Sequence, residues 1–252
     1  MNQVEKANLF QTLHAPGEPI VLYNIWDAGS AAALTNAGAK AVATGSAAVA
    51  AAQGYDDGEA IPMDFLLQLA SRIVESVDVP VSVDFEGAYA AEPELVAANV
   101  AEVIRTGAVG INFEDRVVSG DGLYPLDLQV QRIKAIREEA ASQGIPFFIN
   151  ARTDVFLASN AEQHHSHVYE AIERAAAYAD AGASGFFIPG LANLDFIHQI
   201  VSSRRLTVNV LMMGELNSIH EVVEVGVGRA SYGPVPYRKS MEDLVACYRE
   251  LK

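Results

Sequence analysis

Short apolar runs typical of strands alternate with segments of helical periodicity along the whole chain. The strand-like runs lie at 20–26, 41–46, 79–86, 108–115, 146–153, 185–190, 206–213 and 229–233. The helical segments lie at 28–38, 62–77, 92–106, 127–143, 161–181, 193–204, 216–226 and 237–251. This alternation indicates parallel strands joined by right-handed crossovers. Eight such units predict an α/β fold closed as a (β/α)8 TIM barrel, because an open sheet would leave exposed edges.

The size and composition of the chain suit one barrel domain. Its 252 residues, of which 50% are hydrophobic, match the usual length of about 250 residues for such a barrel. No linker, low-complexity tract or shift in composition divides the sequence. We therefore expect a single domain over residues 1–252.

Charge and targeting signals narrow the class of partner. The net charge of −15 disfavours binding to the phosphate backbone of nucleic acids. Cys247 is the only cysteine, which excludes an intrachain disulfide and favours a reducing compartment. The N-terminal segment lacks the apolar core of a signal peptide, and no apolar run is long enough to span a bilayer. We expect a cytoplasmic protein that binds a small molecule, with neither nucleic acid nor membrane as partner.

Polar side chains gather at the downstream ends of the strand-like runs. In a (β/α)8 barrel the chemistry lies on the loops that follow the strands. Those positions hold Trp26, Asp27, Thr44, Gly45, Ser46, Asp84, Glu86, Glu114, Asp115, Arg116, Arg152, Asp154, Pro189, Gly190, Asn209 and Tyr232. Acids are common at solvated strand ends, which is the alternative interpretation. A scattered solvated surface would not confine them to one end of apolar strands, so we interpret them as a functional site.

Three acids of this set form a candidate metal site. Asp84 and Glu86 lie two residues apart in the run 79–86, so their side chains are expected to point the same way. Carboxylates held together repel unless a cation or a shared proton lies between them, and Mg²⁺ is the simplest partner for such oxygens. Glu114 would face the pair from the next strand. The sequence therefore predicts that Asp84, Glu86 and Glu114 bind Mg²⁺.

Arg152 provides a candidate anion site opposite these acids. Its guanidinium can bind a carboxylate through two parallel hydrogen bonds. Acids for a metal and an arginine for an anion together suit a small, metal-chelating acid. Trp26 could wall the substrate side or pack in the core, and Asn209 could line the pocket or cap the barrel. We keep both as candidate substrate-binding residues.

Six segments match one known pattern in order along the chain. They are WDAGSA at 26–31, GYDD at 54–57, VDFEGAY at 83–89, NFED at 112–115, ARTD at 151–154 and SYGPVPYR at 231–238. Together they resemble the isocitrate lyase/phosphoenolpyruvate mutase superfamily over nearly the whole chain. The resemblance implies a (β/α)8 TIM barrel of that type.

The resemblance also implies how a metal would be held. Asp84 would bind Mg²⁺ directly, while Glu86 and Glu114 would act mainly through bound waters. The ion would chelate the carboxylate and keto oxygens of a 2-oxo acid. Physically, a cation placed in advance would meet the charge that develops on the keto oxygen.

The same resemblance implies how a substrate would be held. Arg152 would offset the charge of the carboxylate and of the developing enolate, and Asp57 would face the substrate. Backbone N–H groups near Ser46 and Ala47 would bind the substrate carboxylate. The candidate catalytic residues are therefore Asp57, Glu114 and Arg152. The resemblance further implies a homo-oligomer, a dimer or a tetramer, with an exchanged C-terminal helix.

One loop departs from the family pattern. Lyases of the family carry a Lys-Lys-Cys-Gly-His loop after the Glu-Asp strand, whereas this chain reads RVVSGDGLYPLD at 116–127. The loop has no cysteine, no histidine and none of the asparagine found in phosphonate-type members. Asp121 and Tyr124 are its proton-transfer candidates.

These observations leave three hypotheses. The leading one is a Mg²⁺-dependent lyase that cleaves or decarboxylates an oxaloacetate-like 2-oxo acid through a metal-bound enolate. The second is a mutase or hydrolase that acts on the C–P bond of a phosphonopyruvate-like substrate. The third is a 2-oxo acid binder without turnover, because the loop 116–127 offers no obvious acid or base.

Overall fold

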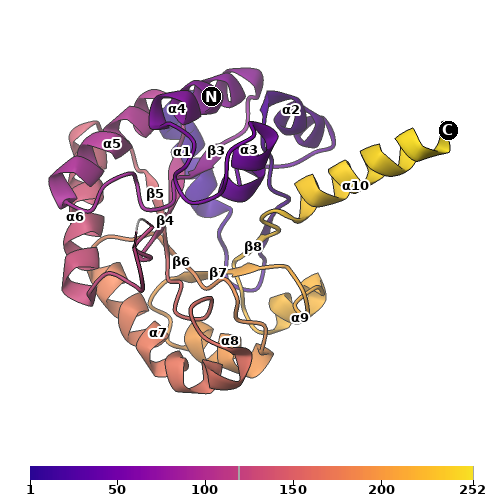
Figure 1. The fold of residues 1–252 in the computed structure, drawn as a ribbon. Helices are drawn as coiled ribbons and strands as arrows, with labels where there is room; N and C mark the ends of the chain where they lie inside the picture. The colour runs from indigo at the N-terminus through magenta and orange to yellow at the C-terminus, as the bar shows by residue number, and fades with distance from the viewer. Residues whose placement is uncertain (119, 252) are drawn as a thin grey trace.

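A computed structural model describes residues 1–118 and 120–251. Within this part of the chain, eight strands form one parallel sheet in the order β1-β8-β7-β6-β5-β4-β3-β2 (Figure 1). The strands are β1 (Ile20–Leu22), β2 (Val42–Ala43), β3 (Val81–Asp84), β4 (Gly110–Glu114), β5 (Phe148–Arg152), β6 (Gly185–Phe187), β7 (Thr207–Leu211) and β8 (Arg229–Ser231). With helices between the strands, this is the predicted (β/α)8 barrel, which is confirmed.

The sheet closes between its first and second strands by a short contact beyond their ends. Ile25 and Thr44 form a parallel bridge, in which the Ile25 N–H donates to Ala43 O over 2.9 Å. The Gly45 N–H donates back to Ile25 O over 3.3 Å. The barrel is therefore closed at the end where the strands terminate, which is the end that carries the site.

Helices cover the outside of the barrel. They are α1 (Gln3–Thr12), α2 (Ala28–Asn36), α3 (Ser46–Ala52), α4 (Met63–Ser76), α5 (Pro93–Arg105), α6 (Leu126–Ser142), α7 (His164–Asp180), α8 (Leu194–Ser202), α9 (Ile219–Glu224) and α10 (Val235–Glu250), with a 3₁₀ turn at Ala161–Gln163. Among the described residues, every helix is too short or too polar to cross a lipid bilayer.

The helices pack because each presents an apolar face to the sheet. In α5 the buried side chains include Val96, Val100, Val103 and Ile104, with Val96, Val100 and Ile104 four residues apart and Val103 three after Val100. That spacing places them on one side of the helix. Each such side chain stabilises the fold by about 1.5–3 kcal/mol when it leaves water. Helical periodicity in the sequence therefore predicted this layer well.

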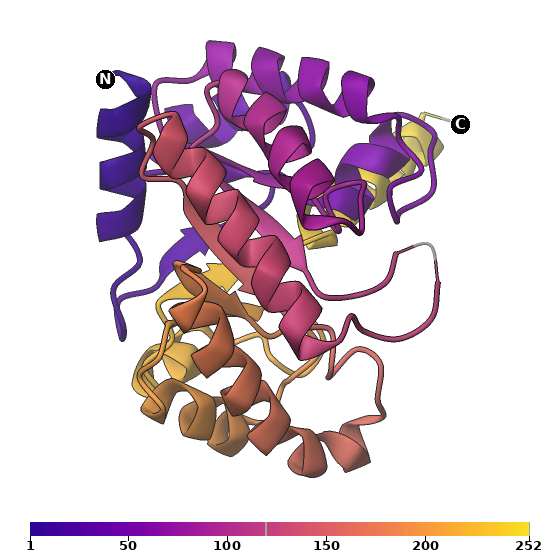
Figure 2. The same cartoon turned by 90° about the vertical axis from the view of Figure 1, so that its left-hand side faces the viewer.

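Two helices were not predicted. In α1 the Asn2 side chain accepts from Glu5 N–H over 2.9 Å, and the Glu5 carboxylate accepts from Asn2 N–H over 2.8 Å. This capping box starts a helix that buries Phe10 against Phe148, with 5.3 Å between ring centroids. Figure 2 shows α1 at one end of the barrel and the loop after β4 at the other. The second is α3, which begins at Ser46. A strand was predicted over 41–46, but β2 ends at Ala43 and leaves Ser46 to start the helix.

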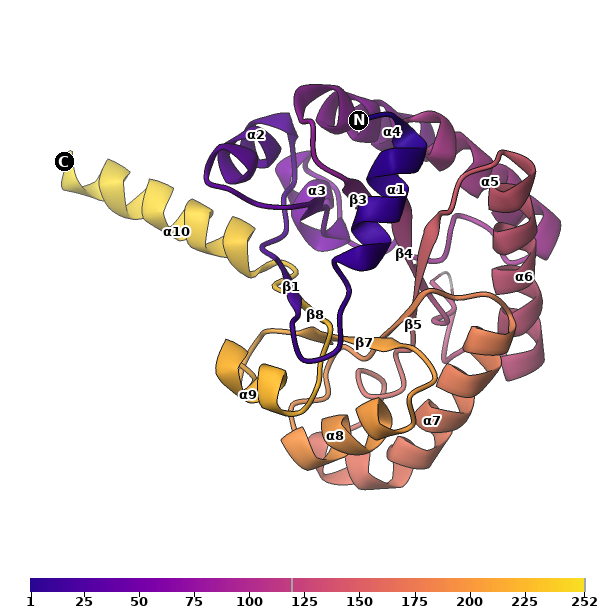
Figure 3. The ribbon, with the colours of Figure 1, turned by 180° about the vertical axis from the view of Figure 1, so that it is seen from behind.

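The last helix leaves the body of the barrel. Figures 1 and 3 show α10 extending away from the other helices. Pro236 is its only buried described residue, and Leu244, Val245 and Tyr248 are exposed by 63%, 45% and 58%. Apolar side chains on a helix are normally covered, and Leu244 and Val245 are exposed here.

Candidate active site

A cavity of about 230 Å³ opens where the strands end. On the side of the mouth formed by β2 to β5 its polar lining consists of Ser46, Asp57, Asp84, Asn112 and Arg152, and Asn24, Ser231 and Arg238 add polar groups elsewhere. This size suits a small metabolite, since sites for larger ligands usually measure about 300–1,000 Å³. The cavity lies at the end of the barrel where chemistry is expected.

Asp84 is the acid best placed to bind a cation. It is the last residue of β3 and is 9% exposed, with Oδ2 accepting from Ser46 N–H over 3.0 Å. Its Oδ1 is buried and has no hydrogen-bond partner among the described residues. Burial raises the pKa of this carboxyl, and the nearby Arg152 works in the opposite direction. An unpartnered buried carboxylate oxygen is costly unless a cation or proton joins it.

Glu86 does not continue the strand. β3 ends at Asp84, and Glu86 has a φ of +49°, so the alternation of strand side chains no longer applies to it. Both of its carboxylate oxygens accept from Glu59 N–H at 3.1 Å. Burial raises the pKa of Glu86 to about 8, and the Asp84 and Asp57 carboxylates reinforce the shift. Glu86 therefore lies electrostatically close to Asp84 but is held by Glu59, in the loop between α3 and α4.

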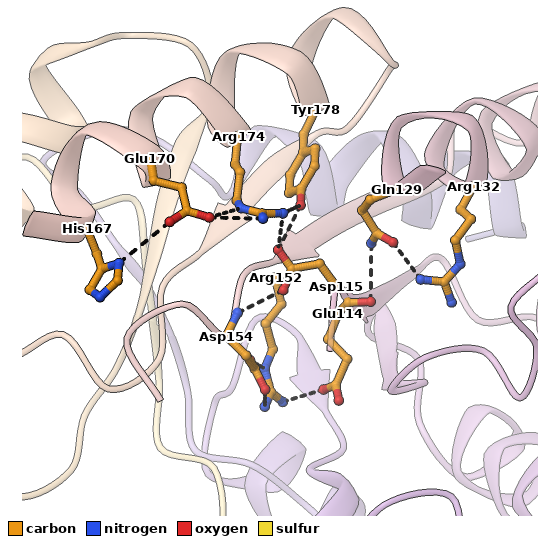
Figure 4. A network of polar contacts seen from close by, with 10 residues as sticks. All are labelled: Glu114, Asp115, Gln129, Arg132, Arg152, Asp154, His167, Glu170, Arg174 and Tyr178. Carbon is orange, nitrogen blue, oxygen red and sulfur yellow. Dashed lines mark hydrogen bonds and ion pairs between the residues drawn. The ribbon is translucent and has the colours of Figure 1, made fainter. Parts of the chain in front are cut away.

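Glu114 pairs with the candidate anion-binding arginine. Its Oε2 lies 2.8 Å from Arg152 Nη1, and Arg152 Nε and Nη2 bind the two oxygens of Asp154 at 2.5 and 2.8 Å (Figure 4). Burial raises the pKa of Glu114; Arg152 opposes this, and Asp154, Asp84 and Glu86 add to it. Burial disfavours the charge of Arg152, yet the carboxylates around it raise its pKa above the ordinary value. The carboxylates of this cluster thus outnumber the one guanidinium, Arg152, that they surround.

A buried network supports this pair from behind. Asp115 is 0% exposed, and it accepts from Tyr178 OH at 2.8 Å, Arg174 Nη1 at 3.2 Å and Asp154 N–H at 2.9 Å. Figure 4 shows Arg174 and Tyr178 reaching Asp115 from one helix, α7. Because Asp115 holds the backbone of Asp154, and Asp154 holds Arg152, the network fixes where the guanidinium lies.

Arg132 supports the acidic side of the site. It is fully buried, and Nη2 donates to Gly87 O and Ala90 O at 2.7 and 2.9 Å. Its guanidinium lies 4.6 Å from the ring centroid of Phe113 and 4.1 Å from that of Tyr124. It also donates to Gln129 Oε1, whose amide donates to Glu114 O. Arg132 thus connects the turn that carries Glu86 with the end of β4 that carries Glu114, directly on one side and through Gln129 on the other.

Asp84, Glu86 and Glu114 are the acids predicted to bind Mg²⁺. In the residues that the structure describes, no three His, Cys, Asp or Glu side chains are grouped to hold one ion together. Asp84, Glu86 and Glu114 therefore do not converge as three direct ligands. Mg²⁺ keeps several waters and commonly takes one or two carboxylates. The free Oδ1 of Asp84 beside further acids fits that mode, so a metal role for the three stays a prediction.

The remaining predicted residues fall in different places. Asp57 and Ala47 line the cavity, as does Ser46, although its N–H already donates to Asp84. Trp26 lies outside the cavity, with its ring edge-on to Tyr237 at 5.3 Å. Asn209 is buried within the barrel, and its Oδ1 accepts from Ser231 Oγ over 3.1 Å.

The loop after β4 forms a hairpin over the acidic side. Arg116 and Leu123 form an antiparallel bridge, and Val118 lies close to Gly87 and Gly58. A Cβ on Gly87 would lie 3.0 Å from the Val118 side chain, a tight contact that glycine avoids. Asp121 is exposed, whereas Tyr124 stacks on Arg132. Residue 119 of the loop lies outside the described residues.

Sequence reasoning missed several residues of the site. Asn24, Asn112 and Arg238 line the cavity, and the buried Arg229 donates to Asn112 and Ser231 of its lining. Arg132 is buried behind the acids. Asn112 and Arg238 stand inside two of the six matched motifs, which is a signal that could have found them. Asn24 follows the first strand by two residues. Nothing in the local sequence distinguishes Arg132 from a surface arginine of α6.

Comparison with known proteins agrees with this geometry. The family model described as "Phosphoenolpyruvate phosphomutase" matches residues 10–252. The chain belongs to the isocitrate lyase/phosphoenolpyruvate mutase superfamily. The resemblance carried by the six motifs is thereby confirmed.

Three relatives illustrate the range of names among similar proteins. The crystal structure titled as a putative phosphonomutase from Burkholderia cenocepacia J2315 is 42% identical, with a TM-score of 0.97 and 100% of both chains covered. An uncharacterised protein of Mycobacterium tuberculosis is 34% identical over 90% of this chain and 83% of its own. The oxaloacetate decarboxylase of Ectopseudomonas mendocina is 26% identical over 82% of this chain and 70% of its own. Two of these three names are therefore names of enzymes, a putative phosphonomutase and an oxaloacetate decarboxylase.

Proposed function

We propose that this chain is a Mg²⁺-dependent enzyme that cleaves or decarboxylates a small 2-oxo acid at the bond beta to its keto group. One observation carries the proposal: Asp84, whose buried Oδ1 has no hydrogen-bond partner among the described residues, lines the same 230 Å³ cavity as Arg152. A cation site and an anion site in one small cavity suit an oxaloacetate-like acid, which offers both a carboxylate and a chelating keto oxygen. The relative named oxaloacetate decarboxylase supports this choice.

The proposed roles follow from how each residue is held. Asp84 would bind the ion directly, and Glu86 and Glu114 would orient its waters. When bound, Mg²⁺ would supply positive charge for the keto oxygen as negative charge develops there. Arg152 would bind the substrate carboxylate, since Glu114 and Asp154 already fix its orientation. Asp57 would face the substrate across the cavity.

The test is loss of oxaloacetate with and without Mg²⁺, in the wild type and in Asp84→Ala. We expect turnover that depends on the metal and that Asp84→Ala abolishes. Equal rates in all four conditions would contradict the proposal. Tight oxalate binding without product from any 2-oxo acid would instead support a binding protein that has lost turnover.

A second candidate is chemistry at a C–P bond. The family model and the 42% identical structure both carry names of phosphonate mutases, which favours it. Phosphonopyruvate incubated with the protein and followed by ³¹P NMR separates the two. Appearance of phosphate or a rearranged phosphate ester would favour this candidate.

We also propose that the chain forms a homo-oligomer through α10. The helix leaves its own barrel and exposes Leu244 and Val245. Burying such residues against a second copy would remove them from water. Light scattering is expected to give a mass of two or four chains. A monomer at all concentrations would contradict the proposal.

A further inference from the structure

The cavity has a second half that is apolar. Six side chains line it on the side formed by β5 to β8: Leu157, Phe187, Pro189, Leu211, Met213 and Pro234. Phe187 is where the two halves meet, because the Arg152 guanidinium lies 6.0 Å from the centroid of its ring. A substrate carboxylate bound at Arg152 would therefore have the apolar half next to it.

The two leucines of this half each pack against a glycine, Leu157 against Gly190 and Leu211 against Gly233. A Cβ on Gly190 would come within 2.8 Å of Leu157 Cδ2, and Gly190 has a φ of +88°. A Cβ on Gly233 would come within 2.8 Å of Leu211 Cδ1, and Gly233 has a φ of +51°. A side chain at either position would meet the leucine methyl group, and the positive φ disfavours any residue but glycine there. The two glycines thus leave the space that the leucines occupy beside the cavity.

Two polar side chains next to this half, Ser231 and Asn24, already have hydrogen-bond partners. Ser231 Oγ accepts from Arg229 Nε at 3.2 Å and donates to Asn209 Oδ1 at 3.1 Å. The Asn24 side chain accepts from Gly233 N–H at 2.8 Å and donates to Thr44 O at 2.8 Å. Arg238 lines the cavity as well, but it is exposed on α10. A carboxylate placed against the six apolar side chains and away from Arg238 would lack a hydrogen-bond partner, which is costly.

We infer that the substrate is a 2-oxo acid whose carbon chain beyond the keto group carries an alkyl substituent, which the six apolar side chains bind. The inference rests on the proposed function, because the polar half must hold the 2-oxo acid end. Leu157 and Met213 are exposed by 48% and 41% at the mouth, and the alkyl group covers them when it binds.

The inference is tested by calorimetry on the full chain with Mg²⁺ and a set of uncleaved acids. Oxalate reports the polar half alone. Pyruvate, 2-oxobutanoate and 2-oxopentanoate add methylenes one at a time, and each is expected to tighten Kd by about fourfold. 2-Oxoglutarate has the same five carbons as 2-oxopentanoate but ends in a carboxylate, and it is expected to bind at least about tenfold more weakly.

Two variants assign the effect to the apolar half. Leu211→Thr should bind oxalate and lose most of the dependence on chain length. Leu95→Thr, on the exposed surface of α5, should keep it. Oxalate binding with no dependence on length, or with 2-oxoglutarate tighter than 2-oxopentanoate, would overturn this inference alone. No binding of oxalate or of any 2-oxo acid would overturn the proposed function and this inference with it.

Discussion

Glu114 Oε2 and Arg152 Nη1 lie 2.8 Å apart, and the two residues are direct partners in the register of β4 and β5. Asp154 binds the other edge of the same guanidinium. Arg152 is therefore fixed on two sides by the protein itself, and any substrate carboxylate meets a cation whose direction is already set. A preset direction lowers the ordering cost of binding.

Arg152→Lys is expected to weaken oxalate binding by about 10–100-fold, because an ammonium cannot replace the planar fork that meets two carboxylates and a ligand. Calorimetry measures the change. Arg72→Lys is the matched control, since Arg72 forms an ion pair with Glu75 in which both side chains are largely exposed. Equal affinities in wild type and Arg152→Lys would show that Arg152 does not touch the ligand.

Arg132→Met is expected to lower the free energy of unfolding by about 2–4 kcal/mol, because two backbone carbonyls lose their buried donor. It should also weaken Mg²⁺ binding, since Arg132 ties together the segments that carry Glu86 and Glu114. Urea denaturation gives the first value and calorimetry the second. A destabilised variant with unchanged metal affinity would restrict Arg132 to a purely structural role. Arg72→Met should change neither quantity.

Tyr178→Phe removes one hydroxyl that donates to Asp115 and leaves the ring in place. The expected loss is about 1–2 kcal/mol of unfolding free energy, as for other hydrogen bonds to a charged group. Tyr169→Phe on the same helix changes a side chain that is 79% exposed and should cost nothing measurable. If both variants unfold at the wild-type urea concentration, Asp115 does not depend on the Tyr178 hydroxyl.

The stability of the protein is expected to fall below about pH 6.5 through His14. Burial lowers the pKa of His14 from 6.5 to about 3, with Arg229 adding to the shift. Between these values the unfolded chain binds one proton more than the folded chain, so stability rises with pH there and levels off above. The loss by pH 5 is about 2 kcal/mol, at about 1.4 kcal/mol per pH unit.

His14→Phe is the variant that isolates this effect. The ring of His14 stacks on Phe148 with 4.0 Å between centroids, which phenylalanine can preserve. Urea denaturation at pH 5 and pH 7.5 should give a smaller pH dependence for the variant by about 2 kcal/mol. The same pH dependence in both proteins would contradict a neutral buried His14.

The sequence was a good guide to the barrel because eight strands and most helices repeat one local pattern. It was a poor guide where local pattern and tertiary contact disagree. Glu86 looked like a strand residue, but β3 ends two residues earlier and a turn sets its direction. The run 46–52 is mostly alanine, with neither alternation nor a side-chain cap to mark it as a helix.

In the candidate site, too, some residues follow from local sequence pattern and others only from tertiary contacts. Asp84 and Arg152 could be found because polar residues at strand ends are unusual in otherwise apolar runs. Arg132 could not, because its partners are backbone carbonyls and two aromatic rings that only the folded chain brings to it. The apolar half of the cavity was also missed, since leucine, methionine and proline after a strand look like core.

The most direct test of the central claim is calorimetric titration of Mg²⁺ into the protein with oxalate present, for wild type, Asp84→Asn and Asp64→Asn. Asp64 lies exposed on α4 and serves as the control. The expected result is one Mg²⁺ per chain in the wild type and in Asp64→Asn, with affinity at least about 100-fold lower in Asp84→Asn. Equal Mg²⁺ affinity in wild type and Asp84→Asn, or no Mg²⁺ binding by the wild type, would contradict the account.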